Sequence, residues 1–322
     1  MYKAMAKVGI EERYHHTGEV ILNYVAGPDN GPPMVFLPGQ TVTWEEYYRI
    51  MPMLADRFQV FAVTLRGHGK SSWTPGRYTF NQLGADLITF LRDVVRRPAI
   101  VVGNSSGGVL AAWLAANAAA HVKGIVLEDP PLFRCDFANI KSTVVYDGFL
   151  DLSKMAVANS GGYAGMLANA RPIVVDPSGV VKDLPRFLKW LGGLYMAWRQ
   201  AVAPGAPVDL VMLPPMFRIM IKGVTQFDGH FSRAFVEGTM GEGFDHAETL
   251  GRITQPILFL HAKWFKYEGR LYGALDDEDV ARVRSLVKGP WKYLRMDCAH
   301  AIALDAPRKE AEEISTWVNE CL

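Results

Sequence analysis

Short apolar runs separated by Gly, Pro and polar turns dominate the first 130 positions of the chain. The runs at 20–27, 34–39, 58–67, 99–103 and 123–129 have the length and composition of β-strands. Between them, residues 43–57 and 79–97 have helical periodicity, and an alanine-rich helical stretch reaches residue 120. Near-continuous apolar strands that alternate with helices predict an α/β fold, in which helices cover both faces of a mostly parallel sheet.

This alternation stops at Pro130 and resumes with an apolar strand at 254–262. A helix at 277–287, a strand at 291–297 and a final helix from Pro307 follow. We therefore expect a core domain made of 1–131 and 251–322, interrupted by a helical cap, or lid, at 132–250.

The expected cap is rich in Met and aromatic residues, in helix-like pieces broken by Gly and Pro. Trp190, Tyr195, Trp198 and Met216 are candidates for the walls of an apolar substrate pocket. The alternative is that these side chains form ordinary helical core. The same apolar segment could also supply the surface of a homo-oligomer.

Charge and cysteine content narrow the class of partner. The net charge of +1 comes from 34 basic and 33 acidic residues without a long run of one sign, which argues against nucleic acid and membrane surfaces as partners. Three scattered cysteines match neither a disulfide framework nor a metal site, and no signal peptide or membrane-length apolar run is found. We expect a cytoplasmic protein that acts on a small or neutral molecule.

The stretch GNSSG at 103–107 has the G-x-S-x-G pattern, directly after a strand and at the start of a helix. In that context the sharp turn exposes Ser105 above the sheet as a nucleophile, and the flanking glycines avoid collisions. The alternative is a Gly-rich turn that binds phosphate or only reverses the chain. The stretch lacks the G-K-[ST] and G-x-G-x-x-G signatures of phosphate loops.

A serine nucleophile needs a base that is itself oriented by a third group. Of the eight histidines, His300 is the best placed, because it follows the last predicted strand in a loop that can reach back over the sheet edge. His68, in the turn after the strand 58–67, is interpreted as a surface residue, and His261 could line a pocket.

The acidic residue that would orient His300 is in an unusual position. Residues 261–267, after the strand 254–262, contain no carboxylate, whereas Glu128 and Asp129 end the strand 123–129 at the same sheet edge. Neighbouring strands lie about 5 Å apart, so a carboxylate there can reach a histidine held over Ser105. We predict Asp129 as the acid, with Glu128 as the alternative; a purely structural role for both acids stays open.

Ester chemistry also needs donors for the developing oxyanion. One candidate is the backbone amide of Ser106, the residue after the nucleophile. The other is the amide of Gln40, where Gly39 lets the backbone approach the site. Pro38-Gly39 could equally be an ordinary turn.

Taken together, LRGHGKSS (65–72), GNSSGG and CAHAIALDAP resemble the α/β-hydrolase family over nearly the whole chain. An acid after the sixth strand and a Ser-Ser turn are similar to the lactonases that hydrolyse zearalenone, a macrocyclic resorcylic lactone. LPGQTVTW, TLRGHGKSSWTPGRY, GNSSGGVLAAWL and LEDPP look like the bacterial zearalenone hydrolases, mainly over 34–131. The cap resembles them less clearly.

The resemblance implies a hydrolase without metal or organic cofactor. Ser105 would attack the lactone carbonyl, His300 would take its proton, and Asp129 would hold the imidazole. Two rivals remain: a carbon-carbon bond hydrolase of aromatic degradation, and a binding protein or receptor with a hydrolase fold.

Overall fold

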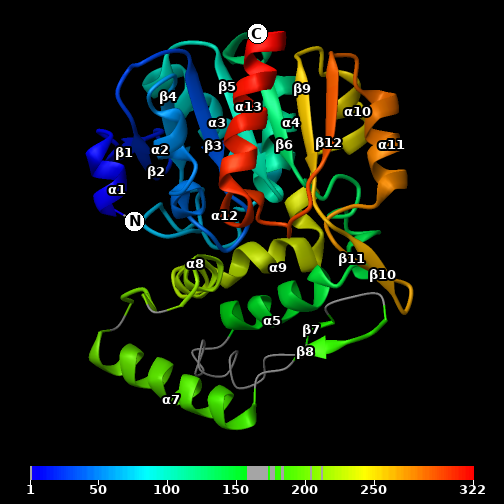
Figure 1. Ribbon diagram of the computed structural model, residues 1–322. Coiled ribbons are helices and arrows are strands. Elements are labelled where there is room, and N and C mark those ends of the chain that lie inside the picture. The colour runs from blue at the N-terminus through cyan, green and yellow to red at the C-terminus, as the bar shows by residue number, and fades with distance from the viewer. Residues whose placement is uncertain (1, 158–172, 175–177, 183–184, 204, 212) are drawn as a thin grey trace.

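A central eight-stranded sheet organises the computed structural model, which describes residues 2–157, 173–174, 178–182, 185–203, 205–211 and 213–322 (Figure 1). The strand order is β1-β2-β4-β3-β5-β6-β9-β12, with β2 antiparallel to both of its neighbours, β1 and β4, and the remaining pairs parallel. The strands are β1 (Glu11–His16), β2 (Ile21–Ala26), β3 (Pro33–Leu37), β4 (Gln59–Val63), β5 (Ala99–Asn104), β6 (Val122–Glu128), β9 (Ile257–His261) and β12 (Trp291–Arg295). The predicted α/β fold with a mostly parallel sheet is confirmed.

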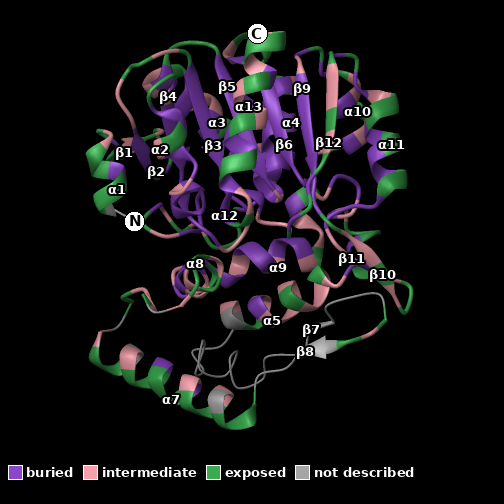
Figure 2. Ribbon diagram, in the orientation of Figure 1, coloured by how far each residue is buried: buried purple, intermediate pink, exposed green. Residues whose placement is uncertain are grey.

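Helices cover both faces of the sheet (Figure 2), and two large apolar clusters fill the space between helices and strands. Within β5, Ala99 and Val101 belong to one cluster and Ile100 and Val102 to the other, so the strand is buried on both faces. This explains its continuous apolar sequence. The helices of the first face are α3 (Phe80–Phe90), α4 (Ser106–Asn117), α10 (His246–Gly251) and α11 (Asp277–Leu286); those of the second are α1 (Tyr2–Lys7), α2 (Met51–Leu54), α12 (Ile302–Asp305) and α13 (Pro307–Cys321).

Two elements differ from the predicted ones. Strand β1 was not predicted, because its sequence EERYHH is polar and it lies mostly exposed at the sheet edge, paired with β2 alone. The helix expected at 43–57 is a short 3-10 helix, Trp44–Tyr47, followed by the short α2. Pro52 at the start of α2 explains the interruption, since proline has no N–H to continue the preceding turn.

The chain between β6 and β9 includes α5 (Val145–Val157), α7 (Arg186–Val202), α8 (Pro215–Val224) and α9 (Gly229–Glu237). These helices lie beyond the edge of the sheet where its parallel strands end, and α5 packs along α9 (Figure 1). Helix α10 differs, because it packs against α4 and α11 at the side of the sheet. The last residues of the range expected for the cap, from His246 on, therefore belong to the helical layer of the core.

Helix α7, with 17 residues, is the longest helix that the structure describes. No helix in the described ranges has both the length and the apolar character needed to span a bilayer.

Candidate active site

Ser105 occupies the tight turn between β5 and α4. Its backbone has φ 54° and ψ −123°, a strained conformation for a residue with a side chain. The Ser105 amide donates to the carbonyl of Glu128 (3.0 Å), which ties the turn to the end of β6. A side chain at Gly107 would lie 2.0 Å from the carbonyl oxygen of Leu37, so α4 can approach β3 this closely only with glycine there.

His300 lies in the loop between β12 and α12, and its Nδ1 is 2.6 Å from Oδ2 of Asp129. The side-chain amide of Asn104, the residue before Ser105, donates to the His300 carbonyl at 2.9 Å. Ser105 and His300 line the same cavity. The three predicted residues are thus brought together, although His300 follows Asp129 by 171 positions in the chain.

Asp129 is held from β9, the neighbouring strand. Its amide donates to the Leu260 carbonyl (2.8 Å), and its Oδ1 accepts from the amide of Ala262 (3.3 Å). Its φ of 45° turns the chain sharply after β6. The end of β9, where no carboxylate was found in the sequence, therefore supplies a backbone donor to the acid of β6.

Glu128, the alternative acid, points to a different environment. It is fully buried, its Oε2 accepts from the hydroxyl of Tyr47 (3.1 Å), and it interacts with the buried Glu310 of α13. Between the two candidates, Asp129 is the one that contacts the His300 ring.

The loop after β3 presents the second predicted oxyanion donor. On one side of Gln40, the Gly39 amide donates to Oε2 of Glu46 (2.9 Å); on the other, the Thr41 amide donates to Nε2 of His68 (3.1 Å). Within the described ranges, neither the Gln40 amide nor the Ser106 amide has a protein acceptor. A Cβ on Gly39 would lie 3.2 Å from that of Ser105, so this loop passes directly over the nucleophile.

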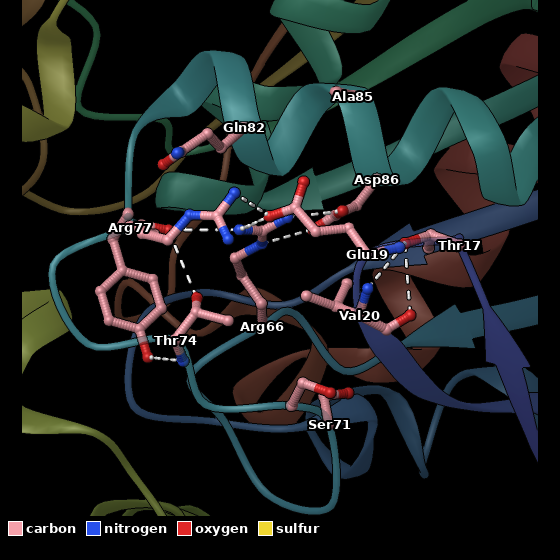
Figure 3. Close-up of polar contacts among 12 residues, drawn as sticks. Thr17, Glu19, Val20, Arg66, Ser71, Thr74, Arg77, Gln82, Ala85 and Asp86 are labelled. Carbon is pink, nitrogen blue, oxygen red and sulfur yellow. Dashed lines mark hydrogen bonds and ion pairs between the residues drawn. The ribbon is translucent and has the colours of Figure 1, made fainter.

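His68 was interpreted as a surface residue, and this is wrong: it is 1% exposed. Burial lowers its pKa to about 4, so the ring is neutral; Nδ1 donates to the Arg66 carbonyl (3.0 Å) and Nε2 accepts from Thr41. Arg66 is itself anchored, because its guanidinium forms two hydrogen bonds with Asp86 of α3, at 2.6 and 2.7 Å (Figure 3). The segment after β4 thereby fixes the loop at Gln40.

Glu46 is a site residue that the sequence analysis missed. It lines the cavity and is 2% exposed. Burial raises its pKa to about 8; the Gly39 amide works against this shift and the nearby Glu128 adds to it. The missed signal was an acid on the apolar side of the segment 43–57.

The pKa of His300 results from opposing effects. Burial lowers it, but the hydrogen bond and charge of Asp129, with further contributions from Glu46 and Glu128, raise it above 6.5 overall. An imidazole with a carboxylate behind it and a hydroxyl-bearing turn in the same cavity can work as a general base.

The cavity above Ser105 has a volume of about 490 Å³ and lies between the sheet edge and the inserted helices. Its lining surface is mostly apolar, and α5, α8 and α9 contribute part of it. The apolar residues from these helices are Val145, Phe149, Leu152, Met216, Met220 and Phe235. Its size is typical of sites for drug-sized ligands.

The pocket residues expected from the sequence divide into two groups. Gly39 and Met216 line the cavity. Trp190, Tyr195 and Trp198 do not, because they lie on the solvent-exposed side of α7. His261 is also outside the cavity: it is fully buried, with its ring bonded to the Tyr293 hydroxyl (3.0 Å) and the Leu275 carbonyl (3.1 Å).

Arg134 is a cation in the cavity lining, and its charge is already paired. Its guanidinium contacts Asp279 (2.6 Å) and Asp276 (3.1 Å), the acids that cap α11. Asp276 therefore both caps α11 and, with Asp279, compensates the charge of Arg134.

Comparison with known proteins agrees with this geometry. Residues 32–152 match the family model described as the alpha/beta hydrolase fold. A 2-(acetamidomethylene)succinate hydrolase of Mesorhizobium japonicum is 30% identical over 48% of this chain and 56% of its own length. A 3-oxoadipate enol-lactonase of Acinetobacter baylyi is 32% identical over 30% of this chain and 37% of its own length. The matched part is thus about half the length of the first relative and about a third of the second.

Solved structures extend the likeness to the whole fold. E-2-(acetamidomethylene)succinate hydrolase gives a TM-score of 0.62 at 19% identity, covering 96% of this chain and 99% of that one. An enol-lactonase from Burkholderia xenovorans gives 0.63 at 15% identity, covering 95% and 100%. The chain has the α/β-hydrolase fold, and its residues 32–152 are similar in sequence to that family.

Proposed function

We propose that this protein is a serine hydrolase that opens the ester bond of a neutral, apolar lactone or ester. The observation that carries the proposal is the contact of His300 with Asp129 at 2.6 Å beside the strained Ser105 turn, in one apolar cavity. The named lactonase among the relatives supports the reaction type.

In the first half of the reaction, Ser105 Oγ attacks the carbonyl carbon while Nε2 of His300 takes the hydroxyl proton. Asp129 accepts from Nδ1, which keeps the other ring nitrogen unprotonated and stabilises the imidazolium that forms. The backbone amides of Gln40 and Ser106, which have no acceptor among the described residues, donate hydrogen bonds to the oxyanion. His300 then protonates the leaving oxygen, and the acyl group stays on Ser105.

In the second half, His300 takes a proton from a water molecule, which attacks the acyl carbon. The same two amides stabilise the second oxyanion, and Ser105 leaves with the proton returned by His300. A lactone is released as a hydroxy acid, because its alcohol and acid halves remain joined.

The cavity favours a substrate without charge. Its walls are mainly aliphatic and aromatic, and Arg134 is already paired with two carboxylates. An additional negative charge would meet the carboxylate of Asp129 close to the reacting atoms. We propose zearalenone, a neutral macrocyclic lactone, as a representative substrate, since the motifs over 34–131 resemble the zearalenone hydrolases.

A carbon-carbon bond hydrolase is the second candidate. Its aromatic ring-cleavage substrates are anionic and would need an uncompensated cation in the cavity. In the described lining the cations are Arg134, which is paired, and His300 when protonated. The neutral lactone is therefore the better match.

The test is to incubate the protein with a slowly turned-over aryl lactone and to analyse it by mass spectrometry after digestion. We expect an acyl adduct on Ser105, and we expect Ser105→Ala to lose activity by about 10⁵-fold or more. Hydrolysis of zearalenone and of an anionic dienoate should be measured in parallel, with the lactone preferred. Binding of the lactone without turnover or adduct would instead identify a receptor.

A further inference from the structure

Much of helix α7 is exposed (Figure 2), and the exposed residues include most of its large apolar side chains. Its large apolar residues recur three or four positions apart and are between 39% and 61% exposed. They are Phe187, Trp190, Leu191, Leu194, Tyr195 and Trp198. We call this surface the α7 face; Val202 extends it by one turn and is also exposed.

The opposite side of α7 is more buried but less apolar. Gly193 and Met196 are buried there, and Lys189, Gly192 and Arg199 are half-buried. A helix on the surface of a monomer normally has the reverse arrangement, with apolar residues inside and polar residues outside. The α7 face is therefore built to be covered.

The area of the α7 face matches one side of a protein interface. Its four aromatic residues are 39–61% exposed, which at 150–250 Å² per side chain amounts to roughly 400 Å². Leu191, Leu194 and Val202, each about half exposed, add to this. Monomers rarely expose apolar patches above a few hundred Å², whereas each partner of a standard interface contributes about 800 Å².

We propose that the α7 face pairs with the same face of a second copy, with the two helices antiparallel about a twofold axis. An axis between Leu194 and Tyr195 places Phe187 opposite Val202, and Leu191 opposite Trp198. Each pair combines a large aromatic with a smaller aliphatic side chain, as interdigitation requires.

The same axis leaves Arg199 out of the contact, because Arg199 lies on the half-buried side of α7. It also keeps like charges apart. The two copies of Arg186 fall about 17 residues apart along the helix pair, which is about 25 Å at 1.5 Å per residue. Aromatic residues at the centre with few charges are typical of interface cores.

A lipid surface fits this face less well. Helices that lie in a membrane interface carry several Lys or Arg along the edge of the inserted side. In α7 the exposed cation is Arg186, while Lys189 and Arg199 lie on the half-buried side. The pairing of large aromatic with smaller aliphatic side chains about the centre of α7 would also have no role against a lipid surface.

Sedimentation velocity of the full chain over a range of concentrations tests the proposal. We expect a species of twice the 35.7 kDa mass of one chain. Leu191→Glu and Leu194→Glu should each raise the dimer dissociation constant by about 100-fold or more, because each substitution places two carboxylates in an apolar interface. Tyr14→Glu is the matched control, since Tyr14 is an exposed aromatic on the edge strand β1, and it should leave the mass unchanged.

Disulfide cross-linking provides a second measurement that does not depend on weakening the dimer. In a Cys321→Ser background, which removes the exposed native thiol, Leu194→Cys should form covalent dimers on mild oxidation and Met53→Cys should not. A monomer at all concentrations would overturn the proposal. So would a dimer that both Glu variants leave intact, or a monomer that co-sediments with phosphatidylglycerol vesicles through α7. None of these results depends on turnover, so they are separate from the test of the hydrolase.

Discussion

At the scale of single residues, the pairing of Asp129 with His300 sets both the rate and its pH dependence. The raised pKa of His300 means that the ring becomes protonated, and unable to act as a base, at a pH above 6.5. We expect kcat/KM of the wild-type protein to fall as the pH is lowered through that pKa. The measurement is a pH profile of kcat/KM with a neutral aryl ester.

Replacing the acid tests the same pair. Asp129→Asn removes the charge that raises the pKa of His300 and fixes its tautomer, so kcat should fall by about 10³- to 10⁴-fold. The kcat/KM of Asp129→Asn should fall on the acid side at a lower pH than the kcat/KM of the wild type does. Both effects are read from kcat and pH profiles with one substrate.

The control for this prediction is Asp276→Asn, which removes the charge of another acid near the cavity. Asp276 caps α11 and pairs with Arg134, so its loss should lower thermal stability while kcat stays within about tenfold. A larger loss of kcat in Asp276→Asn than in Asp129→Asn would reverse the assignment of the acid.

At the scale of elements, the loop 39–41 depends on two buried side chains from other segments. Glu46 accepts from the Gly39 amide and His68 accepts from the Thr41 amide, so the Gln40 amide is held free between them. Glu46→Ala removes one of these anchors and should lower kcat by about 10- to 100-fold, less than the loss of an oxyanion donor itself. KM should change little, because the oxyanion forms only in the transition state.

Glu46→Gln separates the hydrogen bond from the charge. The glutamine side-chain oxygen can still accept from Gly39, so we expect kcat near that of the wild type. If Glu46→Gln lost as much activity as Glu46→Ala, the charge of Glu46 would matter more than its position. Rate measurements below pH 8, where the carboxyl is neutral, test the hydrogen bond alone, and measurements above pH 8 add the effect of the charge.

The sequence predicted these elements to different extents for identifiable reasons. Strand β5 and the turn at Ser105 could be predicted because burial on both faces and the G-x-S-x-G spacing are local properties. Strand β1 could not, since an exposed edge strand has no apolar pattern. His68 and Glu46 were missed because their partners, Thr41 and Gly39, are set by packing between segments. The aromatic residues of α7 were expected inside, and periodicity alone cannot tell which way an apolar face points.

At the scale of the whole molecule, three buried carboxyl groups from different elements of the fold come together beneath the active site. Glu46 follows β3, Glu128 ends β6, and Glu310 belongs to α13. All three are at most 2% exposed. Burial raises the pKa of Glu310 well above 4.5, and its hydrogen bond with Glu128 adds to the effect, so Glu310 holds a proton that it donates to Glu128.

This cluster predicts how stability depends on pH. Between pH 4.5 and the higher pKa values of the folded state, the folded protein keeps protons that the unfolded chain releases. The contribution of this cluster to the free energy of unfolding therefore decreases as the pH rises from about 4.5 through 8. Glu310→Gln is neutral at every pH and can still donate to Glu128. It should raise the melting temperature by roughly a few degrees at pH 8 or above, with little gain at pH 5.

Thermal unfolding of both proteins from pH 5 to 9 measures this difference. The matched control is Glu312→Gln on the same helix, whose exposed carboxylate is solvated in both states, so its curve should parallel the wild type. A buried carboxyl that keeps its proton contributes most to stability at pH values where the proton is retained. Equal pH slopes for the wild type and Glu310→Gln would show that Glu310 does not hold the extra proton.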